Sequence, residues 1–202
     1  TTYAQNGLVS HQVEEALATG TFREISPFSP DVISSSTDSL ISEVLTKGTI
    51  LNPDTFIISE LLRTSPENVR LTIPQFNKPP IILDLVKSTP FAEGFQVFAA
   101  SDKTRPLDIE AGLYYKGIIS GQPGSLAAIS IFNGEIRGLI GTNSGNMVLG
   151  KRKNNKNSSH ILYNDQNLKV SSNFSCGVED LPHPPRNPKT HRPTNPTRAT
   201  SN

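Results

Sequence analysis

Hydrophobic residues in the first 64 positions recur at the three- and four-residue spacing of amphipathic helices. Ser10 is a good N-cap, so a short helix is predicted over residues 10–20. A second apolar stripe predicts a helix within residues 38–48. Asn52 followed by proline predicts a third helix over residues 53–64, with the apolar stripe Phe56, Ile57, Leu61 and Leu62. This stripe needs another element to pack on.

From residue 68 onward the apolar residues alternate with polar ones, as they do in strands with one buried face. The pair Asn133-Gly134 lies between two such runs and predicts a tight type I′ hairpin, because both central residues of that turn need positive φ. The predicted fold class is α+β, an antiparallel β-meander sheet with the N-terminal helices packed on it. Its strands are expected at residues 69–73, 81–86, 95–100, 113–120, 125–132, 135–141, 147–150 and 160–163.

Composition and charge fit an ordinary globular domain. The 202 residues are 35% hydrophobic and 18% charged, with a formal net charge of +1. Such a balance favours neither nucleic acid nor a polybasic membrane anchor as a partner. The longest apolar runs are too short to span a bilayer. We therefore expect no nucleic acid partner, no membrane partner, and a monomer.

The chain divides into four predicted regions. Residues 1–9 are expected to be an N-terminal arm or the remnant of a signal peptide, because small residues alternate near the start as at a signal peptidase site. Residues 10–170 form the folded domain, and residues 171–181 follow it as a short segment. Residues 182–202 contain six of the sixteen prolines, several basic residues and no acidic one. That composition predicts a disordered linker leading towards a further domain.

The sequence offers no self-contained catalytic set, so the chain itself is predicted not to be an enzyme. No two of its four histidines have the i, i+4 spacing that places two imidazoles on one metal ion. Ser125 follows Gly124 but lacks the glycine pattern of a nucleophile elbow, which favours a turn residue. The basic loop 151–156 has no interleaved aromatic residues and is best interpreted as a solvated loop.

Cys176 is the only cysteine, so it forms no disulfide within the chain. A lone cysteine is most often a small buried hydrophobe. Two neighbouring features disagree with that role: Gly177 permits a close backbone approach, and the polar, proline-rich surroundings make a poor core strand. A ligand role for the thiol therefore stays open beside the buried one.

The run from Leu113 to Ile140 resembles the propeptide of secreted reprolysin-type (adamalysin, ADAM-like) zinc metalloproteases. The short turns and the asparagine-rich loop resemble bacterial versions of that family. The similarity extends over about residues 67–178 and includes the strand Ile82-Leu83-Asp84-Leu85. The residues that carry it are Tyr114, Tyr115, Gly117, Gly121, Pro123, Ser125, Ser130, Gly134, Gly138 and Ile140.

The resemblance implies that residues 10–170 are a propeptide domain and that residues 171–181 are a cysteine switch. Cys176 would then be a metal ligand to the zinc of a downstream catalytic domain, with Phe174, Gly177 and Val178 docking in the cleft. The lead-in Asn-Phe-Ser differs from the Pro-Lys lead-in of animal members. The implied partner is the cognate metalloprotease catalytic domain of the same precursor, and the implied location is extracellular. The chain itself is expected to bind no cofactor.

A second hypothesis remains open from the β-rich pattern alone. The chain is then a stand-alone secreted adhesion or ligand-binding domain. A downstream His-Glu-x-x-His segment distinguishes the two, because only a zinc metalloprotease precursor carries one.

Overall fold

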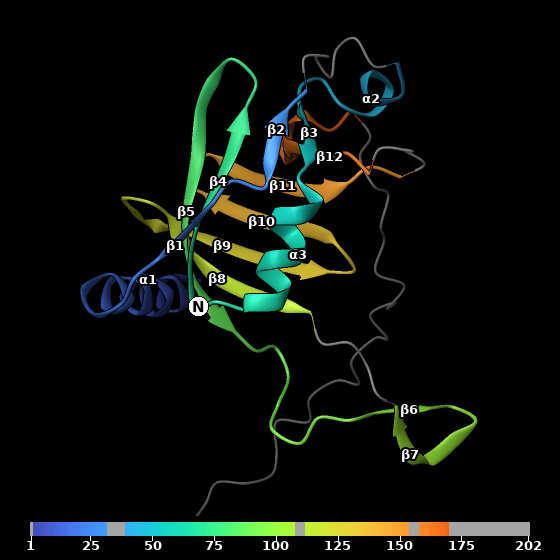
Figure 1. Ribbon diagram of the computed structural model, residues 1–202. Helices are drawn as coiled ribbons and strands as arrows, with labels where there is room; N and C mark the ends of the chain where they lie inside the picture. Colours follow the sequence, from blue (N-terminus) through green and yellow to red (C-terminus); the bar gives the residue numbers. More distant parts are fainter. Residues whose placement is uncertain (1, 32–38, 108–111, 154–157, 170–202) are drawn as a thin grey trace, which may run out of the picture. The chain divides into compact units, whose positions relative to one another are not determined.

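A computed structural model describes residues 2–31, 39–107, 112–153 and 158–169 (Figure 1). Contacts divide the chain into a compact unit of residues 1–170 and a second unit of residues 171–202, which lies outside the described residues. Three helices, a short 3-10 helix and two sheets make up the described part of the first unit. The helices are α1 (Thr2–Thr19), α2 (Ser39–Val44), α3 (Thr55–Thr64) and η1 (Asp165–Asn167).

One sheet contains ten strands, and a separate two-stranded sheet pairs β6 (Val97–Ala99) with β7 (Asp102–Leu107). The order in the large sheet is β1-β4-β5-β8-β9-β10-β11-β12-β3-β2. All its neighbours are antiparallel except β1 and β4. The predicted α+β class with an antiparallel meander is confirmed. The strands of this sheet are β1 (Arg23–Ile25), β2 (Phe28–Pro30), β3 (Thr49–Pro53), β4 (Asn68–Gln75), β5 (Lys78–Ser88), β8 (Leu113–Ile119), β9 (Gln122–Phe132), β10 (Glu135–Thr142), β11 (Gly145–Lys151) and β12 (His160–Asn164).

The large sheet curls back on itself. β1 and β2 are at opposite ends of the strand order, yet only Ser26 and Pro27 separate them in the chain. The Pro27 carbonyl accepts a hydrogen bond of 2.8 Å from Asp54 N at the end of β3. Ten strands with the usual twist reach such a curl naturally. The two halves of the sheet therefore enclose one hydrophobic core.

The concave face of the sheet holds the main core, and α3 covers it. Ile58 and Leu61 of α3 are each 1% exposed and belong to the same buried cluster as strand residues of β4, β5, β8, β9 and β10. In Figure 1, α3 lies in front of β8, β9 and β10. The predicted stripe was partly wrong, because Phe56 is 75% exposed. The predicted start at Pro53 was also wrong, because Pro53 ends β3. Asp54 is the N-cap, and its carboxylate accepts from Phe56 N and Ile57 N.

α1 packs beside β5, β8 and β9 and contributes a second buried layer. Val13 is fully buried but lies outside the main core cluster, as does Ile118 of β8, which pairs with Asp84 on the face opposite the core. The helix begins at Thr2, eight residues before the predicted cap, so the predicted start at Ser10 was wrong. Ser10 instead donates its hydroxyl to Gly7 O within the helix. Val9 and Val13, one turn apart, make the buried stripe continuous through this position.

α2 covers the other end of the sheet through a small cluster of its own. Ile41, Leu45 and Ile50 are buried there, with Ile161 and Tyr163 packed against them. The helix within residues 38–48 was thus predicted correctly, although it is shorter than its apolar pattern.

The hairpins of the meander follow the predicted turn chemistry. Asn133 and Gly134 have φ of 51° and 71°, as the type I′ turn requires. The turn before β9 is tighter than predicted: Gly121 has φ of 75° and β9 begins already at Gln122. β1, β2, β3 and β7 had no prediction. Each is short or lacks a single buried face; for example, every residue of β7 is exposed.

Candidate ligand-binding cavity

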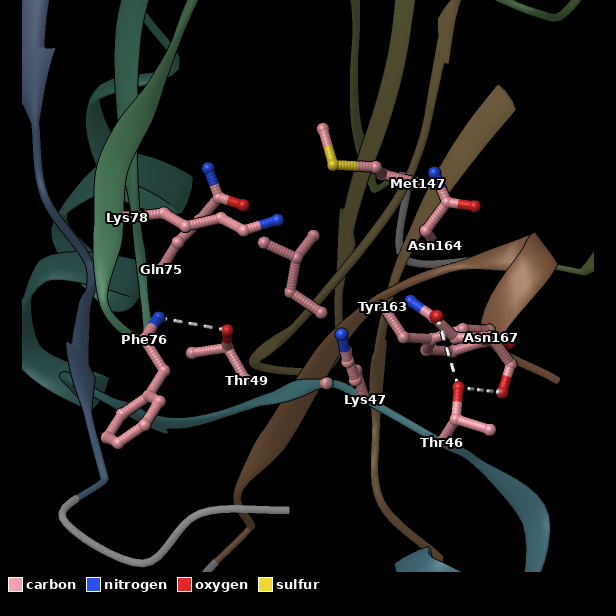
Figure 2. A pocket seen from close by; sticks show the side chains of 12 residues that line it. Thr46, Lys47, Thr49, Gln75, Phe76, Lys78, Met147, Tyr163, Asn164 and Asn167 are labelled. Atoms are coloured by element: carbon pink, nitrogen blue, oxygen red, sulfur yellow. Dashed lines mark hydrogen bonds between the residues drawn. The ribbon is translucent and has the colours of Figure 1, made fainter. Parts of the chain in front are cut away.

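An open cavity of about 370 Å³ lies where the tip of the β4–β5 hairpin meets the start of β3 (Figure 2). The amide of Phe76 donates a 3.1 Å hydrogen bond to Thr49 Oγ1, which joins the hairpin turn to β3. Since these strands are remote in the strand order, only the curl of the sheet creates the cavity. Its lining residues are Thr46, Lys47, Gly48, Thr49, Gln75, Phe76, Lys78, Met147, Leu162, Tyr163, Asn164 and Asn167.

The wall opposite the hairpin is fixed by hydrogen bonds between the α2–β3 connection and η1. Thr46 N donates to Asn167 O over 2.8 Å. Thr46 Oγ1 lies 3.2 Å from that carbonyl oxygen and 3.1 Å from Asn167 Oδ1. Figure 2 shows these contacts at the right of the cavity. Each wall is therefore held by a hydrogen bond from a main-chain amide, that of Phe76 on one side and that of Thr46 on the other.

The charge of the cavity is positive. Lys47 and Lys78 approach it from opposite walls, and in Figure 2 their amino groups are directed towards the same space. Neither amino group forms an ion pair or hydrogen bond with another residue in the described ranges. None of the twelve lining residues is acidic. The lining also has an apolar part, the floor, which is formed by Met147 and the buried Leu162.

The sequence did not point to this cavity. Lys47 and Lys78 are separated by 31 positions and neither lies in a recognisable motif. Lys47 lies in the connection between α2 and β3, and Lys78 is the first residue after the β4–β5 turn. Lysines at such exposed positions are common and indicate no binding site by themselves. Their convergence is a consequence of tertiary folding alone.

The structure does not describe the predicted switch residues. Cys176, Phe174, Gly177 and Val178 are all outside the described residues, so their predicted role stays a prediction.

The other candidate side chains have structural partners. Ser125 is 3% exposed, and its hydroxyl donates to Gln122 O over 2.7 Å while accepting from Ile119 N over 2.8 Å. These bonds tighten the β8–β9 turn, which agrees with the interpretation as a turn residue. His160 is 1% exposed; Nε2 accepts from Ile136 N over 3.3 Å and the ring packs on Phe28 at 5.2 Å.

The His160 ring is held neutral. Burial lowers its pKa, and the nearby backbone of Ser158 and the Glu135 carboxylate offset this only in part. Because Nε2 accepts the Ile136 amide proton, the neutral ring carries its own proton on Nδ1, where no hydrogen bond of regular geometry forms within the described residues.

Residues that carry the family resemblance fill positions with strict backbone or packing demands. Tyr115 is buried and donates its hydroxyl to Pro66 O over 2.8 Å; burial raises its pKa to about 12. A Cβ at Gly117 would lie 2.0 Å from Asp84 O, and one at Gly138 would lie 2.5 Å from a methyl of Ile129. The resembling run thus contains residues that this meander requires.

An ion pair between a buried aspartate and a half-buried arginine lies on the face opposite the core. Asp84 is 1% exposed, and its carboxylate accepts from Arg70 Nε over 2.6 Å across the β4–β5 pair. Glu24 of β1 lies 3.9 Å from the same guanidinium, and the ring of Phe22 stacks near it. The Asp84 carboxylate raises the pKa of Arg70. This pair fixes the register of β4 and β5 rather than forming an open site.

No protein-family model matches this sequence, and the search of curated proteins returned no match either. Within the described ranges, no three histidine, cysteine, aspartate or glutamate side chains are grouped to hold a metal ion. None of the helices there is both long and apolar enough to cross a membrane.

Proposed function

We propose that this chain is the propeptide region of a secreted zinc metalloendopeptidase of the reprolysin type. In this proposal the folded domain assists folding of the catalytic domain that follows it in the precursor, and Cys176 keeps that domain latent. The chain itself is no enzyme. The observation that carries the proposal is the motif from Leu113 to Ile140 followed by Cys176-Gly177-Val178.

The fold supports the proposal through the residues of that motif. They occupy three consecutive strands, β8, β9 and β10, and include the hairpin turn at Asn133-Gly134. Gly117 and Gly138 lie where a side chain would collide with a neighbouring strand or side chain. The fold therefore gives a physical reason why this chain has glycine at two positions of the motif.

The position of the thiol also supports the proposal. Cys176 follows Lys169, the last described residue, by seven positions. Seven residues span at most about 25 Å when extended. The chain between Lys169 and Cys176 therefore limits the thiol to within about 25 Å of the described domain, which is compatible with delivery to a partner that docks on it.

Zinc chemistry explains why a thiol suits this role. A catalytic zinc keeps one coordination position for water, and a thiolate is a strong ligand for that position. When the thiolate occupies it, the water nucleophile is displaced. Only the deprotonated thiol binds, so latency is expected to weaken under acid or thiol-modifying reagents.

A stand-alone ligand-binding domain is the second candidate. The cavity between Lys47 and Lys78 favours it, because unpaired cations facing one space are typical of an anion site. A binding cavity and a propeptide role are compatible in one domain, so the cavity does not argue against the first proposal.

The proposal is tested on the precursor encoded by the gene. We expect the reading frame beyond residue 202 to encode a His-Glu-x-x-His segment. The purified precursor is then assayed for peptidase activity as the parent, as Cys176→Ser and as Ser175→Ala, a matched neighbour. Activity without processing is expected for Cys176→Ser alone. A reading frame without the zinc motif, or equal latency in all three proteins, would show that the thiol is no switch.

A further inference from the structure

We propose that the cavity between Lys47 and Lys78 binds a ligand with two carboxylates on a short aliphatic stem. This inference does not depend on the propeptide role, because the residues that carry it all lie in the folded domain. The ligand is either a free dicarboxylate or a pair of acidic side chains on a peptide.

The two lysine charges in the cavity favour a ligand with two anionic groups. The amino groups of Lys47 and Lys78 face the same cavity from opposite walls, and neither has an anionic partner within the described ranges. Two like charges directed at one space repel each other, and an anion between them removes that repulsion. Because each lysine is a point charge on its own wall, two separate carboxylates satisfy both better than one.

The apolar lining and the volume of the cavity indicate a short aliphatic stem between the two carboxylates. Met147 and Leu162 also line the cavity and contribute apolar surface that methylene groups can cover. A cavity of about 370 Å³ is at the small end of ligand sites, which matches a stem of a few carbons. A compact inorganic anion would leave this apolar floor in contact with water, so phosphate is the poorer ligand.

The walls are built before any ligand arrives. Thr49 Oγ1 holds the hairpin turn through Phe76 N, and Thr46 holds η1 through Asn167. The exposed lysine side chains become ordered on binding, whereas the backbone of both walls is already held. A preformed cavity loses little affinity to reorganisation.

The test uses the full 202-residue chain and nuclear magnetic resonance titrations at low ionic strength. Glutarate and a capped Gly-Glu-Asp-Gly peptide represent the two sources of paired carboxylates; butyrate and inorganic phosphate are the ligand controls. We expect saturable shifts of the amides around Thr49, Lys78 and Asn167 with glutarate, the peptide, or both. The probe that binds more tightly, glutarate or the peptide, identifies the source of the paired carboxylates.

Matched variants assign the binding to the two lysines. Lys47→Gln and Lys78→Gln are each expected to weaken binding by about tenfold to a hundredfold, the range for a lost charge-assisted contact. Lys103→Gln, in the separate β6–β7 sheet, is the control and leaves the affinity unchanged. Because both cavity lysines are exposed, the variants should unfold at the parent temperature.

The proposal is overturned if neither glutarate nor the peptide gives saturable shifts at these amides. It is equally overturned if phosphate binds as tightly as both, or if Lys103→Gln weakens binding as much as the cavity variants. Latency of the protease precursor is measured separately, so failure here and failure of the cysteine switch are distinguishable.

Discussion

Replacing Gly117 with alanine tests the packing of the meander at its tightest point. The added Cβ would lie 2.0 Å from Asp84 O and 2.9 Å from Leu85 Cα, both backbone atoms of β5. An ordinary contact begins near 3.4 Å, well beyond the 2.0 Å to Asp84 O, so the two strands must move apart locally. Hydrogen bonds between strands tolerate only a few tenths of an ångström, so those next to Gly117 would break.

The expected loss is large for a single methyl group. Overpacking in a well-packed region costs about 1–3 kcal/mol, and the rigid backbone partner places Gly117→Ala at the upper end, about 3 kcal/mol. For a domain of this size that loss lowers the melting temperature by about 6–12 °C. Urea unfolding followed by circular dichroism measures the free energy, and a thermal scan measures the temperature.

Gly150→Ala is the matched control. Gly150 is also a strand glycine, in β11, but a Cβ there would meet nothing within 4 Å. Alanine also restricts the unfolded chain, so this variant is expected to be neutral or more stable by up to about 0.5 kcal/mol. If the free energies of unfolding of the two variants differ by less than about 1 kcal/mol in urea, the close approach at Gly117 does not control stability and the reasoning is wrong.

Three further predictions concern buried polar groups. Arg70→Met is expected to lower the free energy of unfolding by about 3 kcal/mol, because it leaves the Asp84 carboxylate, which is 1% exposed, without its cation. Asp84→Asn should cost less, since Arg70 remains one-third exposed to water; equal losses in urea unfolding would contradict this asymmetry. Burial lowers the folded-state pKa of His160, so below about pH 6.5 the unfolded chain binds the proton first and stability falls as the pH decreases. His160→Gln should remove this part of the pH dependence between pH 7 and 5, and an unchanged slope would exclude His160 as its source. Tyrosine absorbance should show one group that ionises near pH 12, and Tyr115→Phe should lack it; a parent protein without that late step would refute the burial argument.

The central meander could be predicted because its information is local. Asn133-Gly134 can form a turn that few other pairs form, and the flanking strands alternate cleanly between a buried and an open face. The edge of the sheet lacks such information. Ile50 and Leu51 of β3 are both buried, one in each cluster, so the segment shows no alternation. Its pairing with β12 and β2 depends on the curl of the whole sheet.

The cavity could not be predicted, because it too depends on the curl of the whole sheet. Lys47 and Lys78 become neighbours only because the hairpin after β4 reaches β3, through the bond between Phe76 and Thr49. The candidate thiol shows the opposite situation. The candidate role of Cys176 comes from a resemblance and from its flanking residues, and in the proposal its geometry is set by a partner domain.

The most direct test of the central proposal is X-ray absorption at the zinc edge of the unprocessed precursor. We predict one sulfur ligand at about 2.3 Å from the zinc in the parent protein. Cys176→Ser should lose that sulfur and show only nitrogen and oxygen neighbours, with Ser175→Ala retaining it. A parent spectrum without sulfur, in a precursor that is latent and loaded with zinc, would contradict the proposal that Cys176 closes the catalytic site.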